Sequence, residues 1–210
     1  MPMITIIDYG MGNVSSIQNM IKKVRGESII TNDRTIINES DAIILPGVGS
    51  FDNGMTKLKS SGLIETIEEK VLINHTPFLG ICLGMQLLFD NSDEGIVSGL
   101  GWVPGEIKRF NFHKEIGEKH RIPHMGWNTV NPTSANCLFK NLMDEARFYF
   151  VHSYYALPKN TEHVLSYTCY GHTFVSSINK ENIWGVQFHP EKSHRFGVTL
   201  IRNFLQIINC

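Results

Sequence analysis

The sequence lacks the features that mark nucleic-acid-binding, membrane and secreted proteins. Its 210 residues carry 19 Lys and Arg against 20 Asp and Glu, so no excess of positive charge predicts a nucleic acid or an anionic membrane as partner. No apolar run approaches the ~20 residues that span a bilayer. The N-terminus has no basic segment ahead of a long apolar one, and we therefore expect no secretory signal.

Cysteine is also scarce, and its spacing excludes two kinds of structure. Cys82, Cys137, Cys169 and Cys210 lie far apart and form no CxxC pair, which argues against a disulfide framework and against a zinc site. A reduced, cytoplasmic protein without a metal or another cofactor is the simplest interpretation. In such a protein one cysteine can be catalytic, and we expect the others to be small apolar core residues.

The order of apolar segments predicts one α/β domain over residues 1–210. In the first half, short strands that are apolar on both faces alternate with helical patterns, which is typical of a parallel sheet covered by helices on both sides. The expected strands are 3–7, 28–31, 41–45 and 77–81, and the expected helices begin after Asn13 and cover 51–59, 63–73 and 83–89.

The second half is richer in strands, so the sheet as a whole is expected to be mixed, although mostly parallel. The sequence shows no internal repeat, no linker and no low-complexity tract. The expected strands are 106–112, 127–130, 146–155, 163–170, 172–178 and 183–188, with a polar hairpin turn at 179–182 and a final amphipathic helix whose apolar positions run from 196 to 208.

A candidate nucleophile lies where the strand 77–81 meets the next helix. Cys82 has glycine two residues before it and two after it, which is the cysteine form of a nucleophile elbow. Such a turn lifts the sulfur above the sheet edge and places it at a helix N-terminus, where the helix dipole favours the thiolate. The N–H of Leu83 would face the same point and can donate to an oxyanion. The alternative is an inert core cysteine, and the elbow alone leaves the two interpretations about even.

A candidate base follows the strand 183–188. His189 lies at the carboxyl end of that strand, where catalytic groups of open α/β sheets gather. Pro190 favours an extended His189, and Glu191 can then reach the far ring nitrogen and stabilise an imidazolium. Nine histidines are present, but the others lack this context. His152, within a strand-like run, is more typical of a structural residue.

A third segment can complete such a site. Gly47 and Gly49 flank Val48 directly after the strand 41–45, and two glycines allow backbone N–H groups to turn toward a ligand. Taken alone, the segment is better explained as an ordinary turn between a strand and a helix. Beside Cys82, on a neighbouring strand, it becomes a candidate oxyanion loop.

The motifs PGVG, GICLGMQ and FHPE, in this order, resemble the class I glutamine amidotransferase family over essentially the whole chain. The resemblance implies a flavodoxin-like core and hydrolysis of L-glutamine through a thioester, with no cofactor. It also assigns residue roles: Cys82, His189 and Glu191 as the triad, Gly47, Val48 and Gly49 as the oxyanion loop, Gln86 as a glutamine-binding residue, and backbone groups of Ser153 and Tyr154 as the holders of the amino-acid end.

Three further segments resemble one subfamily, the glutaminase subunits of imidazole glycerol phosphate synthase, which act in histidine biosynthesis. These are DYGMGN at 8–13, PHMGWN at 123–128 and EKS at 191–193. In that subfamily the glutaminase docks on a separate (β/α)8-barrel cyclase, and Asn13, His124, Trp127 and Lys192 match positions near the interface. Without the resemblance, Trp127 is better explained as a core aromatic and Lys192 as a solvated charge.

The chain ends soon after the triad with no synthase domain, so we expect a separate polypeptide to use the ammonia. We also expect low activity alone and higher activity with the loaded partner. Three alternatives stay open: a paralogous glutaminase that feeds a cyclase-like partner in surface-sugar biosynthesis, a non-catalytic regulatory subunit on the same fold, and a stand-alone cysteine peptidase or γ-glutamyl hydrolase. The intact triad argues against the second, and the Trp127 segment against the third.

Overall fold

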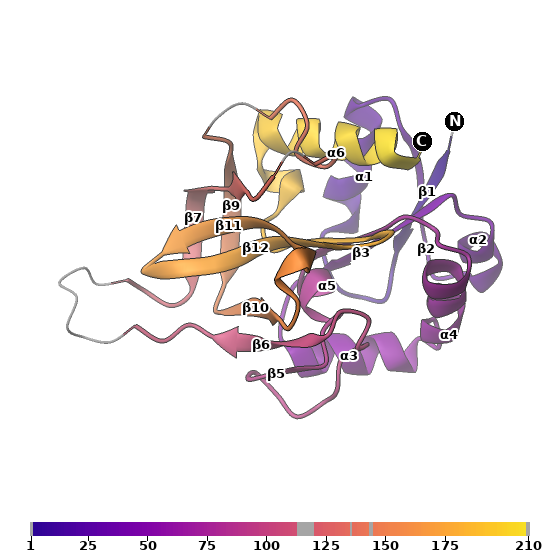
Figure 1. Cartoon of the computed structure of the whole chain (residues 1–210). Helices are drawn as coiled ribbons and strands as arrows, with labels where there is room; N and C mark the ends of the chain where they lie inside the picture. Colours follow the sequence, from indigo (N-terminus) through magenta and orange to yellow (C-terminus); the bar gives the residue numbers. More distant parts are fainter. Residues whose placement is uncertain (1, 113–119, 135, 143–144, 209–210) are drawn as a thin grey trace.

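A mixed β-sheet runs through the molecule, with helices packed on both of its faces (Figure 1). This computed structural model describes residues 2–112, 120–134, 136–142 and 145–208. The helices are α1 Val14–Lys23, α2 Arg34–Asn38, α3 Phe51–Ser60, α4 Ile64–Glu68, α5 Leu83–Gln86 and α6 His194–Ile208. The strands are β1 Met3–Ile7, β2 Glu27–Thr31, β3 Ala42–Gly47, β4 Phe78–Cys82, β5 Asn91–Ser92, β6 Gly105–Arg109, β7 His124–Thr129, β8 Asn131–Pro132, β9 Arg147–His152, β10 Tyr154–Pro158, β11 Val164–Tyr170, β12 His172–Lys180 and β13 Ile183–Val186.

The order of the strands places the predicted site segments side by side. The main sheet runs β2-β1-β3-β4-β13-β12-β10-β6-β5, with β11 on β12 and β8 on β11. The strands from β2 to β13 are parallel, whereas β12, β10 and β6 each pair antiparallel with the strand before them in this order, and β5 pairs parallel with β6. The carboxyl ends of β3, β4 and β13 therefore meet at one edge of the sheet. The mixed, mostly parallel sheet predicted from the sequence is confirmed.

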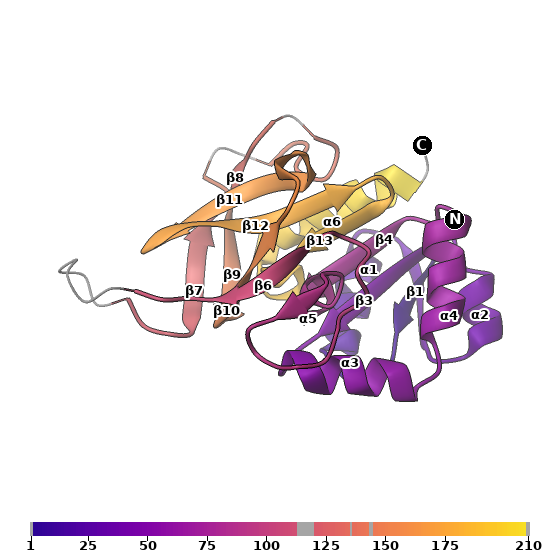
Figure 2. The same ribbon diagram turned by 60° about the horizontal axis from the view of Figure 1, so that its bottom comes forward.

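Alternating side chains of the parallel strands fill two separate cores. In β3, Ile43 and Leu45 pack on one face with residues of α3, α4 and α5, whereas Ala42 and Ile44 pack on the other with α1 and α6. Figure 2 shows α3 and α6 on opposite sides of the sheet. Because both faces are covered, these strands are apolar throughout, as the sequence indicated.

The largest difference from the sequence prediction concerns residues 146–155, which were expected to form one strand. The chain breaks at Ser153: β9 pairs with β7 in a separate two-stranded sheet, and β10 joins the main sheet between β12 and β6. A hydrogen bond spans Ser153, since Nδ1 of His152 lies 2.7 Å from the carbonyl oxygen of Tyr154. A strand pattern does not reveal which sheet each half will join.

The helices differ from the prediction in length. The helix expected over 83–89 ends at Gln86 after four residues, and the one expected over 63–73 is α4 followed by a π-helical turn at Glu69–Ile73. The short helix α2 had not been predicted. Asn13 caps α1 as expected, with its side chain accepting from the N–H of Ser16 at 3.3 Å.

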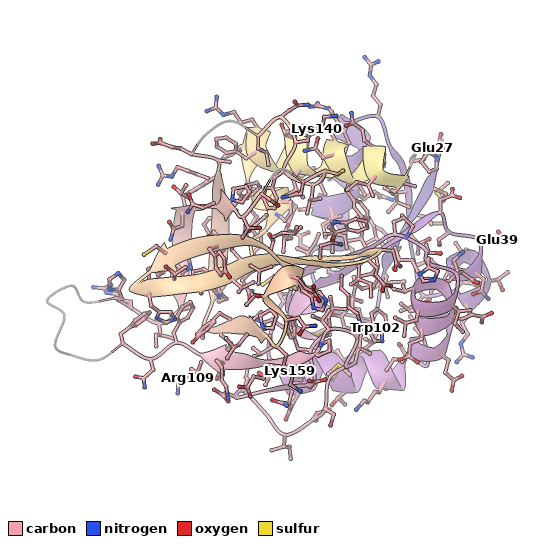
Figure 3. The ribbon with its side chains drawn as sticks, in the orientation of Figure 1. Glu27, Glu39, Trp102, Arg109, Lys140 and Lys159 are labelled. Atoms are coloured by element: carbon pink, nitrogen blue, oxygen red, sulfur yellow. The ribbon has the colours of Figure 1, made fainter. Side chains whose placement is uncertain are left out.

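Charged side chains lie at the periphery and aromatic ones inside. Figure 3 shows Glu27 and Glu39 at the outer edge of the molecule. Trp102 lies in the interior, where its ring packs edge-on against Phe78 at 5.3 Å. Among the described helices, none combines the length and apolarity that crossing a membrane requires.

Candidate active site

The backbone at Cys82 is strained in the way a nucleophile elbow requires. Cys82 has φ 54° and ψ −109°, a conformation that non-glycine residues rarely adopt. Both flanking glycines are needed, because a Cβ at Gly84 would overlap the Leu45 carbonyl oxygen and one at Gly80 would lie 2.7 Å from the Gly84 oxygen. The sulfur is thus held at the end of β4 by close backbone packing.

The PGVG segment lies directly beside this elbow. Gly47 is the register partner of Cys82 in the parallel pair of β3 and β4. A Cβ at Gly47 would lie 2.8 Å from the Leu83 Cβ, so the segment packs onto the first turn of α5 without a gap. Gly49 has φ +114°, which favours glycine. Val48 and Gly49 line the same pocket as Cys82 and Leu83.

His189 and Glu191 form a buried pair across a short turn. His189 Nδ1 lies 2.8 Å from Glu191 Oε1, and their side chains are 1% and 3% exposed. The backbone at His189 is extended, with φ −102° and ψ 96°, and Pro190 begins a 3-10 turn that brings Glu191 back over the ring. The His189 N–H donates to the Tyr149 carbonyl at 2.9 Å, which fixes the turn against β9.

The charge on His189 is set by its two neighbours. Burial lowers the pKa of His189, but Cys82 and Glu191 outweigh burial and raise this pKa to about 10. The imidazole is therefore protonated at neutral pH, beside a sulfur that can carry the negative charge. The sequence had suggested that a helix dipole favours the thiolate, but α5 has only four residues and its dipole is small. The His189 imidazolium supplies the positive charge instead.

One pocket of about 280 Å³ collects the predicted site residues. Its lining includes Cys82, Leu83 and Gln86 from the elbow, Ser153 and Tyr154 at the start of β10, and His189. The Gln86 amide nitrogen donates to the Tyr154 carbonyl oxygen at 3.2 Å and to Gln187 Oε1 at 3.0 Å. Both amide hydrogens are thereby used, and the carbonyl oxygen is the remaining polar atom of that side chain.

Sequence reasoning missed three polar residues at this pocket. Gln187 is buried, and its Nε2 lies 3.7 Å from Cys82 Sγ. Glu94 lines the pocket, and its carboxylate accepts from the N–H of Phe51 at the start of α3, at 2.8 Å. His152 lines it as well. Only Gln187 had a local signal, since it precedes His189 by two residues in the segment that follows β13.

The four positions matched to a partner interface differ in exposure. Asn13 and Lys192 are exposed, and Lys192 Nζ lies 5.6 Å from the Tyr149 ring. Trp127 is 38% exposed and stacks on His194 with centroids 5.3 Å apart, so it is not the core residue that the sequence alone favours. His124 is buried, and its ring points into the molecule.

The remaining cysteines do not behave as expected. Cys137 and Cys169 are exposed free thiols rather than apolar core residues, and Cys210 lies outside the described residues. Across the described ranges, no group of three or more His, Cys, Asp or Glu side chains is placed to hold a metal ion.

The arrangement suits nucleophilic attack on an amide. A strained elbow presents a thiol, a buried imidazole beside it is oriented by a carboxylate, and a glycine-rich loop faces the same pocket. This combination on a doubly wound sheet defines a class of cysteine-dependent amide hydrolases.

Comparisons with known proteins identify the family. The model of the family described as glutamine amidotransferase class-I matches residues 5–208, and the chain belongs to that family. It is 52% identical over 204 residues to imidazole glycerol phosphate synthase subunit HisH 2 of Methanococcus maripaludis, covering 97% of this chain and 99% of that one. It is 42% identical over 206 residues to the subunit HisH 2 of Pseudomonas aeruginosa, with coverages of 98% and 100%.

Solved structures with little sequence identity share the fold. The crystal structure of a glutamine amidotransferase superposes with a TM-score of 0.72 at 14% identity, covering 98% of this chain and 99% of that one. The structure of PurLQS from Thermotoga maritima gives a TM-score of 0.69 at 16% identity, covering 98% of each chain.

Proposed function

We propose that this chain is the glutaminase subunit of an imidazole glycerol phosphate synthase in histidine biosynthesis. It hydrolyses L-glutamine to glutamate and ammonia, and passes the ammonia to a separate (β/α)8-barrel cyclase subunit in a heterodimer. The observation that carries the proposal is the Cys82–His189–Glu191 arrangement in a chain that matches synthase subunits over nearly its whole length. We further propose that residues 1–210 act as one amidotransferase domain in the reducing cytoplasm, where the free thiols of Cys137 and Cys169 would persist.

The first half of the reaction forms a thioester. The Cys82 thiolate attacks the side-chain amide carbon of glutamine, and the resulting oxyanion accepts from N–H groups of Leu83 and of the loop Gly47, Val48 and Gly49. The His189 imidazolium gives its proton to the leaving nitrogen. The C–N bond then breaks, and ammonia leaves the acyl-enzyme.

The second half regenerates the thiolate. His189, now neutral, takes a proton from water, and the hydroxide attacks the thioester carbon. The C–S bond breaks, glutamate leaves, and the imidazolium again faces the thiolate. Glu191 stabilises the charged form of His189 at the start and at the end of the cycle.

The pocket wall offers groups of the right kind for an amino acid. The free carbonyl oxygen of Gln86 and the carboxylate of Glu94 can accept from the substrate ammonium group. Ser153 and Tyr154 line the same pocket, and their backbone groups can hold the substrate carboxylate. Asn13, Trp127 and Lys192 are proposed to contact the barrel, whereas the buried His124 would act from beneath that surface.

The test is glutamine hydrolysis by the chain alone and by its complex with a co-purified barrel subunit, with and without the barrel's ligand. We expect low turnover alone and a large rise in the loaded complex. Cys82→Ala should abolish turnover while complex formation and thermal melting persist, and Cys169→Ala, at an exposed thiol, should change neither. High turnover by the isolated chain, or turnover retained in Cys82→Ala, would contradict the proposal.

A second acceptor pathway is favoured by one observation. Both relatives named above are designated HisH 2, and a second copy of a glutaminase can serve a paralogous cyclase-like partner, such as one in surface-sugar biosynthesis. The chemistry at Cys82 would be the same. The identity of the co-purified barrel and of the product that receives the ammonia distinguishes the two.

A further inference from the structure

A chain of hydrogen bonds runs from β7 to the wall of the pocket. His152 Nδ1 lies 2.7 Å from the Tyr154 carbonyl oxygen, and His152 Nε2 lies 2.9 Å from His124 Nδ1. His124 Nε2 in turn lies 3.3 Å from the amide nitrogen of Asn128. We call His124 and His152 the histidine pair. None of its contacts is needed to build the triad.

The direction of each bond in the chain follows from its end point. A carbonyl oxygen can only accept, so Nδ1 of His152 carries the proton. In a neutral ring Nε2 then accepts, and the donor must be Nδ1 of His124. That leaves Nε2 of His124 to accept from Asn128, whose amide nitrogen also donates to the Cys169 carbonyl at 2.8 Å. One arrangement of protons satisfies every link.

Packing and charge keep both rings in this arrangement. His124 is stacked between Tyr170, at 4.0 Å between centroids, and Phe150, at 4.8 Å. Burial, together with the smaller effects of His124 and His189, lowers the pKa of His152 to about 3 despite the bond to Tyr154. Burial and then His120 lower the pKa of His124 to about 4. Both rings are therefore neutral at the near-neutral pH at which the triad would act.

The Tyr154 carbonyl oxygen joins the histidine pair to the nucleophile. It accepts from His152 and also from Gln86, which donates in addition to Gln187. Gln187 contacts the Cys82 sulfur. The Tyr154 carbonyl is thus held by two donors, and Tyr154 lines the same pocket as Cys82.

We propose that His152, supported by His124, is a positioning residue that fixes the Tyr154 peptide and thereby sets the affinity of the pocket for glutamine. The proposal rests on the glutaminase function proposed above. The outer side of β7 carries Met125, which is 61% exposed. The inner side of the same strand carries His124 and Asn128. Displacement of β7 would reach Tyr154 through two rigid rings, so the strand that faces outward also adjusts the substrate wall.

The first test reads the protons directly and needs no turnover. Nitrogen-15-labelled histidine in the full chain should show His152 and His124 as neutral rings protonated at Nδ1 from pH 5.5 to 8. Resonances are assigned with His152→Gln and His124→Phe. Protonation of His152 at Nε2, or titration of either ring near pH 6.5, would overturn the proposal.

The second test uses a matched pair of substitutions at one position. In His152→Asn, the amide nitrogen can occupy the place of Nδ1 and still donate to Tyr154, whereas in His152→Gln the amide lies nearer the place of Nε2 and loses that bond. We expect His152→Gln to raise KM for glutamine about tenfold and His152→Asn about twofold, with kcat of both within about threefold of the original. The assay uses the complex with the barrel subunit.

His172→Gln is the control, because His152 and His172 both pack against the Phe110 ring, at 5.2 Å and 5.4 Å, but His172 lies outside the chain of bonds. It should leave KM unchanged. Equal KM changes in all three variants would show a packing role and overturn the proposal. If the original complex hydrolyses no glutamine at all, the proposed function fails, and the nitrogen-15 spectra still decide the role of the histidine pair.

Discussion

The parallel strands β1 to β4 and the antiparallel strands β6 to β12 bring different kinds of groups to one pocket. The parallel part supplies backbone: a strained turn at Cys82 and a glycine loop beside it, both set by close contacts on an aliphatic core. The antiparallel part supplies the Tyr154 wall and rings, with Phe110 alone in contact with seven aromatic or histidine rings. The parallel part therefore depends on close backbone contacts, and the antiparallel part depends on where its side chains carry protons.

This difference predicts how each region should fail. A region that depends on backbone contacts should lose stability and activity together when a methyl group is added. A region that depends on protons should change with pH or with the loss of one charge while the fold persists. His189 lies after β13, where the two regions meet, and depends on both.

The largest effect is expected where the two regions meet, at Glu191→Gln. A neutral amide cannot stabilise the His189 imidazolium, so kcat/KM should fall about 10³-fold. The pKa of His189 should fall too, since Glu191 helps to raise it. Steady-state kinetics and a histidine NMR titration measure both.

Glu162→Gln is the matched control for that charge. Glu162 lies 3.9 Å from His163, but its carboxylate is 76% exposed. Such a pair contributes little, and the substitution should leave turnover unchanged. Equal losses in the two variants would mean that burial of the triad carboxylate is irrelevant.

The next effect belongs to the parallel region, at Gly84→Ala. A Cβ would overlap the Leu45 carbonyl oxygen, so β3 and α5 must separate. We expect a loss of about 3 kcal/mol in the free energy of unfolding together with loss of turnover, measured by urea denaturation and glutamine hydrolysis.

Gly101→Ala is the control that separates the effect of a steric clash from the effect of backbone strain. Gly101 has φ +68°, but its nearest neighbour is the Asp90 carboxylate at 3.5 Å. It should cost about 1 kcal/mol and leave activity intact. A stable, active Gly84→Ala would break the distinction between the two regions.

The smallest effect of a single side chain is expected in the antiparallel region, as a loss of stability in acid. Because the pKa values of His152 and His124 are lowered on folding, the unfolded chain takes up protons below about pH 6.5 while the folded one does not until about pH 4. Stability therefore falls as pH drops through this window, by up to about 2 kcal/mol per histidine at pH 5.

Substitution of His152 tests its part in this loss of stability. In His152→Asn, the loss of stability between pH 7 and pH 5, measured by urea denaturation, should be smaller than in the original chain. His75→Asn, at an exposed ring with φ +52°, should retain the full loss. An unchanged slope in His152→Asn would contradict a buried, neutral His152.

The sequence predicted most strands of both regions, but in the antiparallel one it did not predict the break at Ser153, for a physical reason. The strand β1 and the elbow at Cys82 follow from local patterns: an apolar run, and glycines at fixed offsets. The break at Ser153 depends on which distant strands its two sides join, β7 on one side and β12 and β6 on the other. Short-range periodicity contains no such information.

The candidate site divides in the same way. Cys82, His189 and the Gly47 loop lie at strand ends, and the sheet order alone brings them together. Gln187 meets Cys82, 105 positions away in the chain, and Glu94 meets Phe51 across 43. A single polar residue without a motif gives no sign of a partner at that distance.

The register of β3 on β4 has a consequence for how the protein can vary. Gly47 lies beside Cys82 through the same pairing that aligns Ile43 with Phe78 in the core. A slip by one residue would exchange the two faces of β3, so that side chains fitted to one core would have to pack in the other. The strand pairing that folds the sheet therefore also aligns the Gly47 loop with the Cys82 sulfur. Substitutions can misalign the loop and the sulfur only if they first disrupt the sheet.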